Sequence, residues 1–270
     1  MTLQERLSSM FPGSSGRRRK GWLADGRVRV NGQIVRRGDV AVGAEDRVEL
    51  GRPSRALPEP LRLVHQDEDV FVIDKPAGLL TIATETERTC TAYRLLRDWA
   101  HAQAYGRIFI VHRLDRETSG LLVFARSPAA KAALQAQFEA RTPERIYVAR
   151  VEGIVRAAEG ELTSRLVQDR ALRVRVGSGR ASKAAITRYR VLERYRDATL
   201  LELALVTGRR GQIRVQLAAL GHPIVGDRAY GSRRNPFGRV CLHATRLGFV
   251  HPSGTRVVFE SPVPEAFKRA

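Results

Sequence analysis

Short runs of alternating apolar residues follow one another closely along most of this chain, and few stretches are long enough for a helix. Strand-like runs lie at 61–64, 70–73, 108–111, 121–125, 145–153, 172–177, 184–194, 199–206, 240–250 and 255–260. Beyond the first 55 residues, helical patterns are confined to 91–104, 128–140 and 211–221, and Ser127-Pro128 forms a typical start for the second. Strands that follow one another with few helices between them pair mostly as antiparallel neighbours. We therefore predict an α+β domain with a mixed, mostly antiparallel central sheet and flanking helices.

The first 55 residues differ from the rest and carry twelve basic and six acidic side chains. A basic helical start at 17 precedes the short strand RVRVNG, in which Asn31-Gly32 is typical of a hairpin turn. IVRRGD and RVEL are predicted as further short strands, and the proline-rich segment 51–60 as a linker. We predict a small α/β domain at 1–55 and a larger domain at 56–270.

The chain is strongly basic, because 47 Lys and Arg oppose 28 Asp and Glu and give a net charge of +19. Its 43% of apolar residues is ordinary for a folded protein. An excess of positive charge of this size favours a polyanionic partner, and nucleic acid is the commonest one.

Several other classes of protein are disfavoured by the sequence. Cys90 and Cys241 form no CxxC pair, which favours a reducing cytoplasm over a disulfide framework. The N-terminal residues lack the pattern of a secretory signal, and no apolar stretch is long enough to span a membrane. The six histidines include no pair at metal-ligand spacing on one helix, so we expect no metal.

Asp115 lies among cations in the segment VHRLDRETSGLLVFARS at 111–127. His112, Arg113 and Arg116 surround it, and a turn-forming Thr-Ser-Gly leads into an apolar strand. Loops between rigid strands commonly place reactive groups. A single aspartate beside an arginine is nevertheless more often part of a structural ion pair.

Two further segments favour a reactive role for this carboxylate. TGRRGQIRVQLAALGHPIVGDRAYG at 207–231 places Arg209, Arg210 and Arg214 at the start of a helix. We expect Arg214 to reach Asp115 and keep it ionised and oriented. In RIYVARVEG at 145–153, strand alternation puts Tyr147 on the opposite face from its neighbours, where it could pack in the core or stack on a flat base.

These segments resemble the signature motifs of the RluA-like family of RNA pseudouridine synthases. HRLDRETSGLL, RIYVARVEG and TGRRGQIR…LGHPIVGDRAYG match three of them, and VIDKPAGLLT at 72–81 and LHATRLGFVHPSG at 242–254 match two more. The motifs occur in the family's order and cover roughly residues 60–265. The VRVNG…GD…V pattern of the first domain is similar to a small RNA-binding domain first recognised in a ribosomal small-subunit protein.

The resemblance implies an isomerase that needs no cofactor and acts on structured RNA. It assigns Asp115 as the nucleophile, Arg214 as its partner, and Tyr147 as the ring that stacks on uracil. Arg113 would enter the RNA where the uridine is flipped out, and His112, Arg116, Arg209 and Arg210 would contact the RNA. The implied protein is a cytoplasmic monomer of ribosome biogenesis that binds neither a membrane nor a metal.

Three positions depart from the family's pattern, and some alternatives stay open. Gly211 and Gln216 stand where histidines are usual, and Arg145 stands where lysine is usual. The first RNA-binding unit favours large-subunit ribosomal RNA (rRNA) as the substrate, with tRNA, or both RNAs, as the alternative. A non-catalytic RNA-binding or ribosome-assembly protein is a second alternative, although it would not need Asp115, Tyr147 and Arg214 together. A phosphate-handling enzyme is a third, but GRRGQ has neither the Walker nor the dinucleotide spacing.

Overall fold

The computed structural model describes residues 1–51, 57–85, 87–169 and 173–269. Its residues group into two compact units, one of residues 1–59 with 94–107 and the other of residues 60–93 with 108–270. The predicted domain boundary at 55/56 and half of the predicted linker lie at 52–56, outside the described residues. Within the described residues, no helix is long and apolar enough to cross a membrane.

The smaller unit contains a three-stranded antiparallel sheet and two N-terminal helices. Its elements are α1 (Leu3–Met10), α2 (Gly16–Ala24), β1 (Val28–Val30), β2 (Gln33–Ile34) and β3 (Val48–Leu50), with β1 in the middle of the sheet. Asn31 and Gly32 have positive φ and close the predicted hairpin between β1 and β2. The strand predicted around IVRRGD is mostly wrong, because β2 ends at Ile34.

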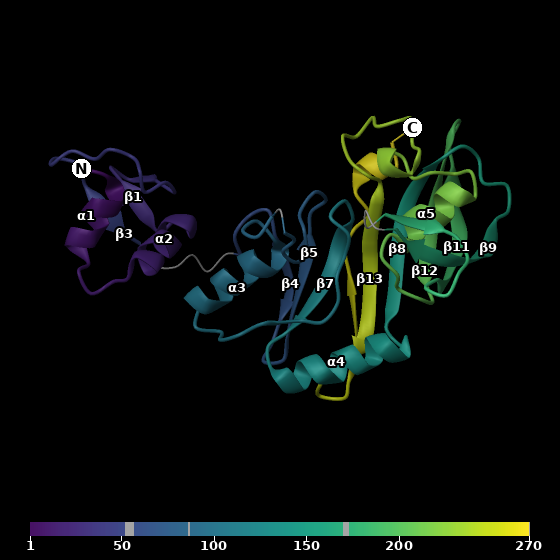
Figure 1. The fold of residues 1–270 in the computed structure, drawn as a ribbon, viewed down its shortest axis with the longest axis horizontal. Coiled ribbons are helices and arrows are strands. Elements are labelled where there is room, and N and C mark those ends of the chain that lie inside the picture. The colour runs from purple at the N-terminus through teal and green to yellow at the C-terminus, as the bar shows by residue number, and fades with distance from the viewer. Residues whose placement is uncertain (52–56, 86, 170–172, 270) are drawn as a thin grey trace. The chain divides into compact units, whose positions relative to one another are not determined.

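The larger unit is built on an eleven-stranded sheet (Figure 1). The strands are β4 (Arg62–Gln66), β5 (Val70–Lys75), β6 (Phe109–Ile110), β7 (Ser119–Ala125), β8 (Glu144–Glu152), β9 (Glu159–Gln168), β10 (Val174–Val176), β11 (Lys183–Arg194), β12 (Ala198–Leu205), β13 (Leu242–Val250) and β14 (Arg256–Glu260). Their order is β10-β9-β11-β12-β8-β13-β7-β5-β4, with β14 beside β13 and β6 beside β7. Among the described strands only β13 and β7 pair in parallel, which confirms the predicted mostly antiparallel α+β fold.

The other helices of the described residues are short, as the sequence predicts. They are α3 (Ala92–Ala102), α4 (Pro128–Ala140) and α5 (Gln212–Ala219), with single turns η1 (Arg228–Tyr230) and η2 (Glu265–Phe267). The Ser127 side chain caps α4 by accepting the Ala130 N–H, as predicted. Figure 1 shows α4 across the ends of β7, β13 and β8, and its Ala130 and Leu134 belong to the core formed with β5, β7 and β13.

The sequence patterns missed α1 and β9. β9 has a single buried side chain, Leu166, so its polar sequence EGELTSRLVQ shows no apolar alternation. Pairing with β10 and β11 on its two edges makes it a strand. α1 buries only Leu3 and Leu7, and its start depends on a capping box in which Thr2 and Glu5 accept each other's N–H groups.

Gly120 allows β7 and β13 to pair closely. Its φ is +113°, and a Cβ atom there would lie 2.2 Å from the Ala244 carbonyl oxygen. Both features exclude an L side chain unless the backbone of β13 moves. The residue therefore fixes how the strand that follows Asp115 joins the last long strand of the sheet.

We predict that Gly120→Ala lowers the free energy of unfolding by at least ~2 kcal/mol, because strain at positive φ adds to a backbone clash. Gly254→Ala is the matched control, since Gly254 also has positive φ but has open space around its Cβ position. It should cost only ~1 kcal/mol. Chemical denaturation of both variants measures the difference, and equal losses would contradict the role given to Gly120.

Candidate active site

The loop between β6 and β7 carries Asp115 and is held on both sides of that residue. On one side, the Thr81 hydroxyl donates to the Leu114 carbonyl at 2.8 Å and accepts the Leu114 N–H at 3.1 Å. On the other side, the Arg116 carbonyl accepts from the Gly78 N–H at 2.8 Å, and Arg116 Nε donates to the Gly78 carbonyl at 3.0 Å. The Asp115 carbonyl accepts the Thr118 N–H and closes the turn. Asp115 is therefore fixed by bonds to its neighbours' backbone.

Lys75 completes this attachment from the end of β5. Its side chain is fully buried, and Nζ donates to the carbonyls of Pro76 at 2.8 Å, Leu79 at 2.7 Å and Arg116 at 3.3 Å. Burial lowers the pKa of Lys75 to about 7, although the charges of Glu117 and Asp115 oppose the shift. A buried ammonium with three carbonyl acceptors ties segment 75–79 to the Asp115 loop.

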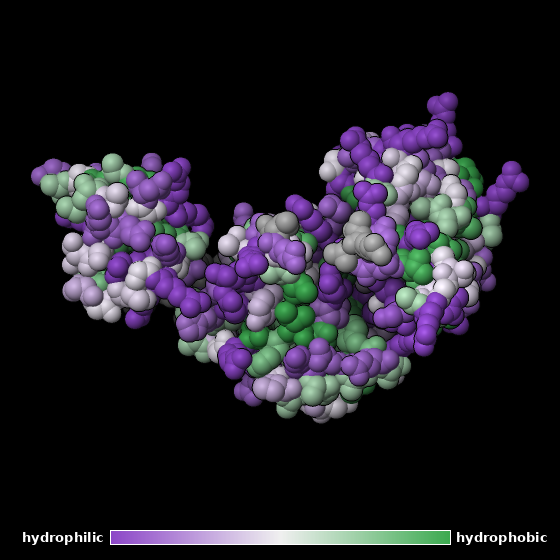
Figure 2. Space-filling view, in the orientation of Figure 1, coloured by the Kyte–Doolittle hydropathy of each residue, from purple (hydrophilic) through white to green (hydrophobic). Residues whose placement is uncertain are grey.

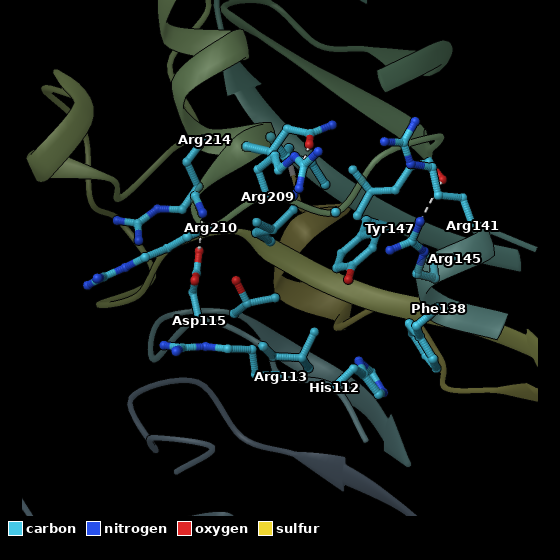
Figure 3. Close-up of a pocket in the computed structure, with 18 of the residues that line it drawn as sticks. His112, Arg113, Asp115, Phe138, Arg141, Arg145, Tyr147, Arg209, Arg210 and Arg214 are labelled. Carbon is cyan, nitrogen blue, oxygen red and sulfur yellow. Dashed lines mark hydrogen bonds between the residues drawn. The ribbon is translucent and has the colours of Figure 1, made fainter. Parts of the chain in front are cut away.

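The start of α5 provides a direct contact to the Asp115 carboxylate. Gly211, the N-cap residue of α5, has φ +59° and donates its N–H to Asp115 Oδ2 at 3.2 Å. Figure 3 shows the carboxylate pointing at this helix start, with Arg113 on its other side. A helix N-terminus favours contacts with negative groups, so this hydrogen bond orients the carboxylate.

The predicted direct pair of Arg214 with Asp115 is not among the ion pairs of the described residues. Arg214 instead donates from Nε and Nη2 to the two carboxylate oxygens of Asp227, at 2.6 and 2.7 Å. Burial lowers the pKa of Arg214, but the hydrogen bonds and charge of Asp227, together with the charge of Asp115, raise it above its ordinary value. The physical reason for the difference is that both oxygens of Asp227 lie within hydrogen-bond distance of the guanidinium, which gives a bidentate contact.

Tyr147 lies on β8 with only 8% of its surface exposed, and its ring borders the cavity beside Arg145. Burial raises the pKa of Tyr147 to about 12, which keeps its hydroxyl protonated. Arg145, on the same face of β8, is also buried, and its Nη2 reaches the Leu205 carbonyl at 3.4 Å. Burial lowers the pKa of this guanidinium.

The other predicted RNA contacts occupy different environments. Arg113 and Arg210 are exposed and line the cavity, where half-buried Arg209 also lies. Arg116 is exposed but does not belong to the cavity lining. The Nε2 atom of His112 accepts the Val123 N–H at 3.2 Å, its ring stacks on Phe138 at 4.5 Å, and burial lowers its pKa to about 3. These contacts make His112 a neutral packing residue and give no support to an RNA contact through charge.

Asp115, Tyr147 and six arginines surround a single open cavity of about 550 Å³. The arginines are Arg113, Arg141, Arg145, Arg209, Arg210 and Arg214. Figure 2 shows a hollowed face on the larger unit, with apolar residues in the hollow and hydrophilic residues along its rims. In Figure 3 the carboxylate lies towards one side of the cavity and the Tyr147 ring towards the other. This arrangement suits a flat, uncharged ring with phosphates around it.

Several residues of the site were missed by sequence reasoning. Thr81 and Lys75 lie in a segment that resembles a family motif, but nothing in one sequence shows that their partners are peptide groups 33 and 41 residues away. Asp227 belongs to the motif at 207–231, but nothing in the sequence marks it as the partner of Arg214. Within the described residues, no group of three or more His, Cys, Asp or Glu side chains could hold a metal ion.

A carboxylate held at a helix start in an arginine-lined cavity, on a mostly antiparallel sheet, suits an enzyme that acts on a ring carried by a polyanion. Residues 69–219 match the family model for RNA pseudouridylate synthase. The chain belongs to this family of isomerases, which convert uridine in RNA to pseudouridine.

Curated relatives support the same assignment, and a solved structure shares the fold. Ribosomal large subunit pseudouridine synthase D of Neisseria meningitidis serogroup B is 37% identical over 279 residues, which cover 96% of this chain and 74% of that protein. An uncharacterized RNA pseudouridine synthase of Bacillus subtilis is 36% identical, over 90% of this chain and 84% of that one. The fold is similar to human RNA pseudouridylate synthase domain containing 4, with a TM-score of 0.63 at 23% identity over 77% of this chain and 90% of that one.

Lys75→Met should remove a pH dependence of stability between about pH 7 and pH 10. The folded pKa of Lys75 is about 7 against an ordinary 10.5, so in this range the unfolded chain binds more protons than the folded one. The contribution of Lys75 to stability therefore increases as the pH rises through this window, and a methionine cannot reproduce it. Chemical denaturation at several pH values should show the wild type gaining stability relative to the variant. Lys183→Met, at an exposed lysine, should give a difference that does not change with pH.

Proposed function

We propose that this protein converts specific uridines of large-subunit rRNA to pseudouridine in the cytoplasm. The observation that carries the proposal is the Asp115 carboxylate, which is fixed by its loop and by the Gly211 N–H in a cavity bordered by the Tyr147 ring. Relatives that are named ribosomal large subunit pseudouridine synthase D cover nearly all of this chain, which favours rRNA as the substrate. The site residues of the cavity all come from one chain, so we propose that a monomer is active.

The reaction requires the uracil to leave its helix, turn and rejoin the same sugar. The bond from C1′ to N1 breaks, a bond from C1′ to C5 forms, N1 gains a proton and C5 loses one. No electrons are gained or lost overall, so the chemistry needs only positioning and charge. In our proposal, Arg113 at the cavity rim fills the space left by the flipped uridine, and the base stacks on Tyr147.

Asp115 supplies the negative charge that this reaction needs. A carboxylate can attack the nucleoside covalently or stabilise a sugar that develops positive charge. Gly211 N–H occupies Oδ2, so Oδ1 is the oxygen left to face the substrate in our proposal. Burial keeps the Tyr147 hydroxyl protonated and the ring uncharged, which suits stacking on uracil.

We also propose that residues 1–55 form an RNA-binding domain of the kind first recognised in a ribosomal small-subunit protein, and that residues 56–270 form the catalytic domain. Support comes from α2, where Arg17, Arg18 and Lys20 are exposed next to each other in sequence. The small unit has its own core around Leu7, Trp22 and neighbouring apolar residues, so it does not need the larger sheet for its packing.

A strain that lacks this protein should lose pseudouridine at specific positions of large-subunit rRNA. Wild-type protein should restore the modification, and Asp115→Asn should not, because the amide has the same shape but cannot act as an anion. Asp197→Asn, at an exposed carboxylate paired with Arg234, is the control and should restore it. Chemical mapping of pseudouridine in all cellular RNA is the measurement. Loss confined to tRNA would favour the tRNA alternative, and restoration by Asp115→Asn would favour a non-catalytic RNA-binding protein.

Affinity for an rRNA fragment should fall steeply with salt, because each neutralised phosphate releases counterions. Replacing Arg17, Arg18 and Lys20 with glutamine should reduce the slope of log affinity against log salt by up to ~2 to 3. The control replaces Arg188, Arg190 and Arg256, three exposed arginines that already pair with carboxylates, and removes the same net charge. Equal slopes for the two variants would contradict a role of α2 in RNA binding.

A further inference from the structure

Arg145 is a buried cation without a charged partner. Only 9% of its surface is exposed, and within the described residues it forms no ion pair and no carboxylate acts on its pKa. Its Nη2 has one long hydrogen bond, to the Leu205 carbonyl at 3.4 Å, and its Nε has no hydrogen-bond partner there. Burial of a charge that is not paired is costly, so a guanidinium kept in this state is typical of a site that binds an acceptor group.

The guanidinium of Arg145 belongs to the wall of the cavity that Asp115 and Tyr147 border. Its carbon atom lies 5.8 Å from the centroid of the Phe138 ring, and a Cβ atom at Gly208 would clash with its Nη1. The bare backbone of Gly208 therefore leaves the space that the guanidinium occupies. In Figure 3, Arg145 lies beside Tyr147, on the side away from Asp115.

This place determines which part of a bound nucleotide the guanidinium meets. The reaction occurs at C1′, so N1 of a uracil stacked on Tyr147 lies towards Asp115. The ring atom opposite N1 is C4, and its oxygen O4 then points towards Arg145. A guanidinium has five N–H donors and no acceptor, which suits a carbonyl oxygen. The phosphates stay on the sugar side of the base, where Arg113 and Arg210 are exposed.

The same contact is compatible with the turn that the base must make. A half-turn of uracil about the line through N3 and C6 exchanges N1 with C5 and O4 with O2. The edge away from the sugar therefore presents a carbonyl oxygen both before and after the turn, and a side chain that only donates can hold both. Cytosine has an amino group in place of O4, so two donors would face each other at this point.

We propose that Arg145 is the residue that recognises the base, by donating a hydrogen bond to O4 of the flipped uridine and thereby selecting uracil over cytosine. The inference rests on the proposed function, because it needs a uracil stacked on Tyr147. It predicts that the benefit of Arg145 depends on the identity of the atom bonded to C4 of the target base.

The test compares uridine with 4-thiouridine at the target position of an rRNA fragment, in single-turnover reactions analysed for pseudouridine products by mass spectrometry. Sulfur is a weaker hydrogen-bond acceptor than oxygen, so the wild type should convert the 4-thiouridine RNA roughly tenfold more slowly. Arg145→Met should convert uridine RNA roughly tenfold more slowly than the wild type does. Sulfur should slow this variant at least about threefold less than it slows the wild type, because the donor is gone.

Two further variants separate recognition from folding and from general charge. Arg145→Lys keeps a cation that only donates, so it should convert uridine RNA faster than Arg145→Met does. Arg141→Met removes the same charge from an exposed side chain of the cavity and should be slowed by sulfur as much as the wild type is.

Two results would overturn the inference alone. One is a wild type that sulfur does not slow, a result that needs no variant to fold. The other is an Arg145→Met enzyme that sulfur slows as much as the wild type, because Arg145 would then act on other atoms, such as a phosphate. Failure of the wild type to form pseudouridine in any RNA would overturn the proposed function together with this inference.

Discussion

The hydrogen bonds from Thr81 and Lys75 to the peptide groups on either side of Asp115 are the interactions on which the site depends. The acceptors are carbonyls of the loop that carries Asp115, which Gly78 also holds through its hydrogen bonds with Arg116. Because both donors are buried, water cannot replace these hydrogen bonds. The loop that carries the Asp115 carboxylate is therefore held in place against the end of β5. A reacting group must be held to within a fraction of an ångström, and backbone bonds to a sheet strand achieve this better than a flexible ion pair.

The arginines of the cavity carry the same charge but lie in different environments. Arg214 is fixed by a carboxylate, and Arg145 is buried against Phe138 and Tyr147, whereas Arg113 and Arg210 remain exposed. Arg214 and Arg145 form part of the cavity wall and set its electrostatic potential. Arg113 and Arg210 are exposed and can contact phosphates. In our proposal, the net charge of the chain favours the approach of RNA, and a few buried residues of the cavity act on one nucleotide.

Much of the fold could be read from apolar alternation, and the exceptions have physical reasons. The strands β5, β7 and β8 bury nearly all of their side chains, and the sequence predicts them. The strand β9 has a single buried side chain and is held by backbone pairing on both edges, so its sequence does not predict a strand. The residue types of the site were also predictable, because Asp115, Tyr147 and Arg214 do line one cavity. The partner of Arg214 was not, since the choice between two carboxylates depends on geometry that only the folded loop around Asp227 creates.

The position of β13 in the sheet has a consequence for how the protein is made. β13 lies between β8 and β7, although the 89 residues of 153–241 separate it from β8 along the chain. During synthesis the strands on either side of it emerge long before it does, and each presents an unpaired edge until residue 250 has left the ribosome. An enzyme of this architecture cannot complete its sheet on a partial chain. Newly made molecules therefore depend on folding soon after release, or on protection of these two edges until β13 arrives.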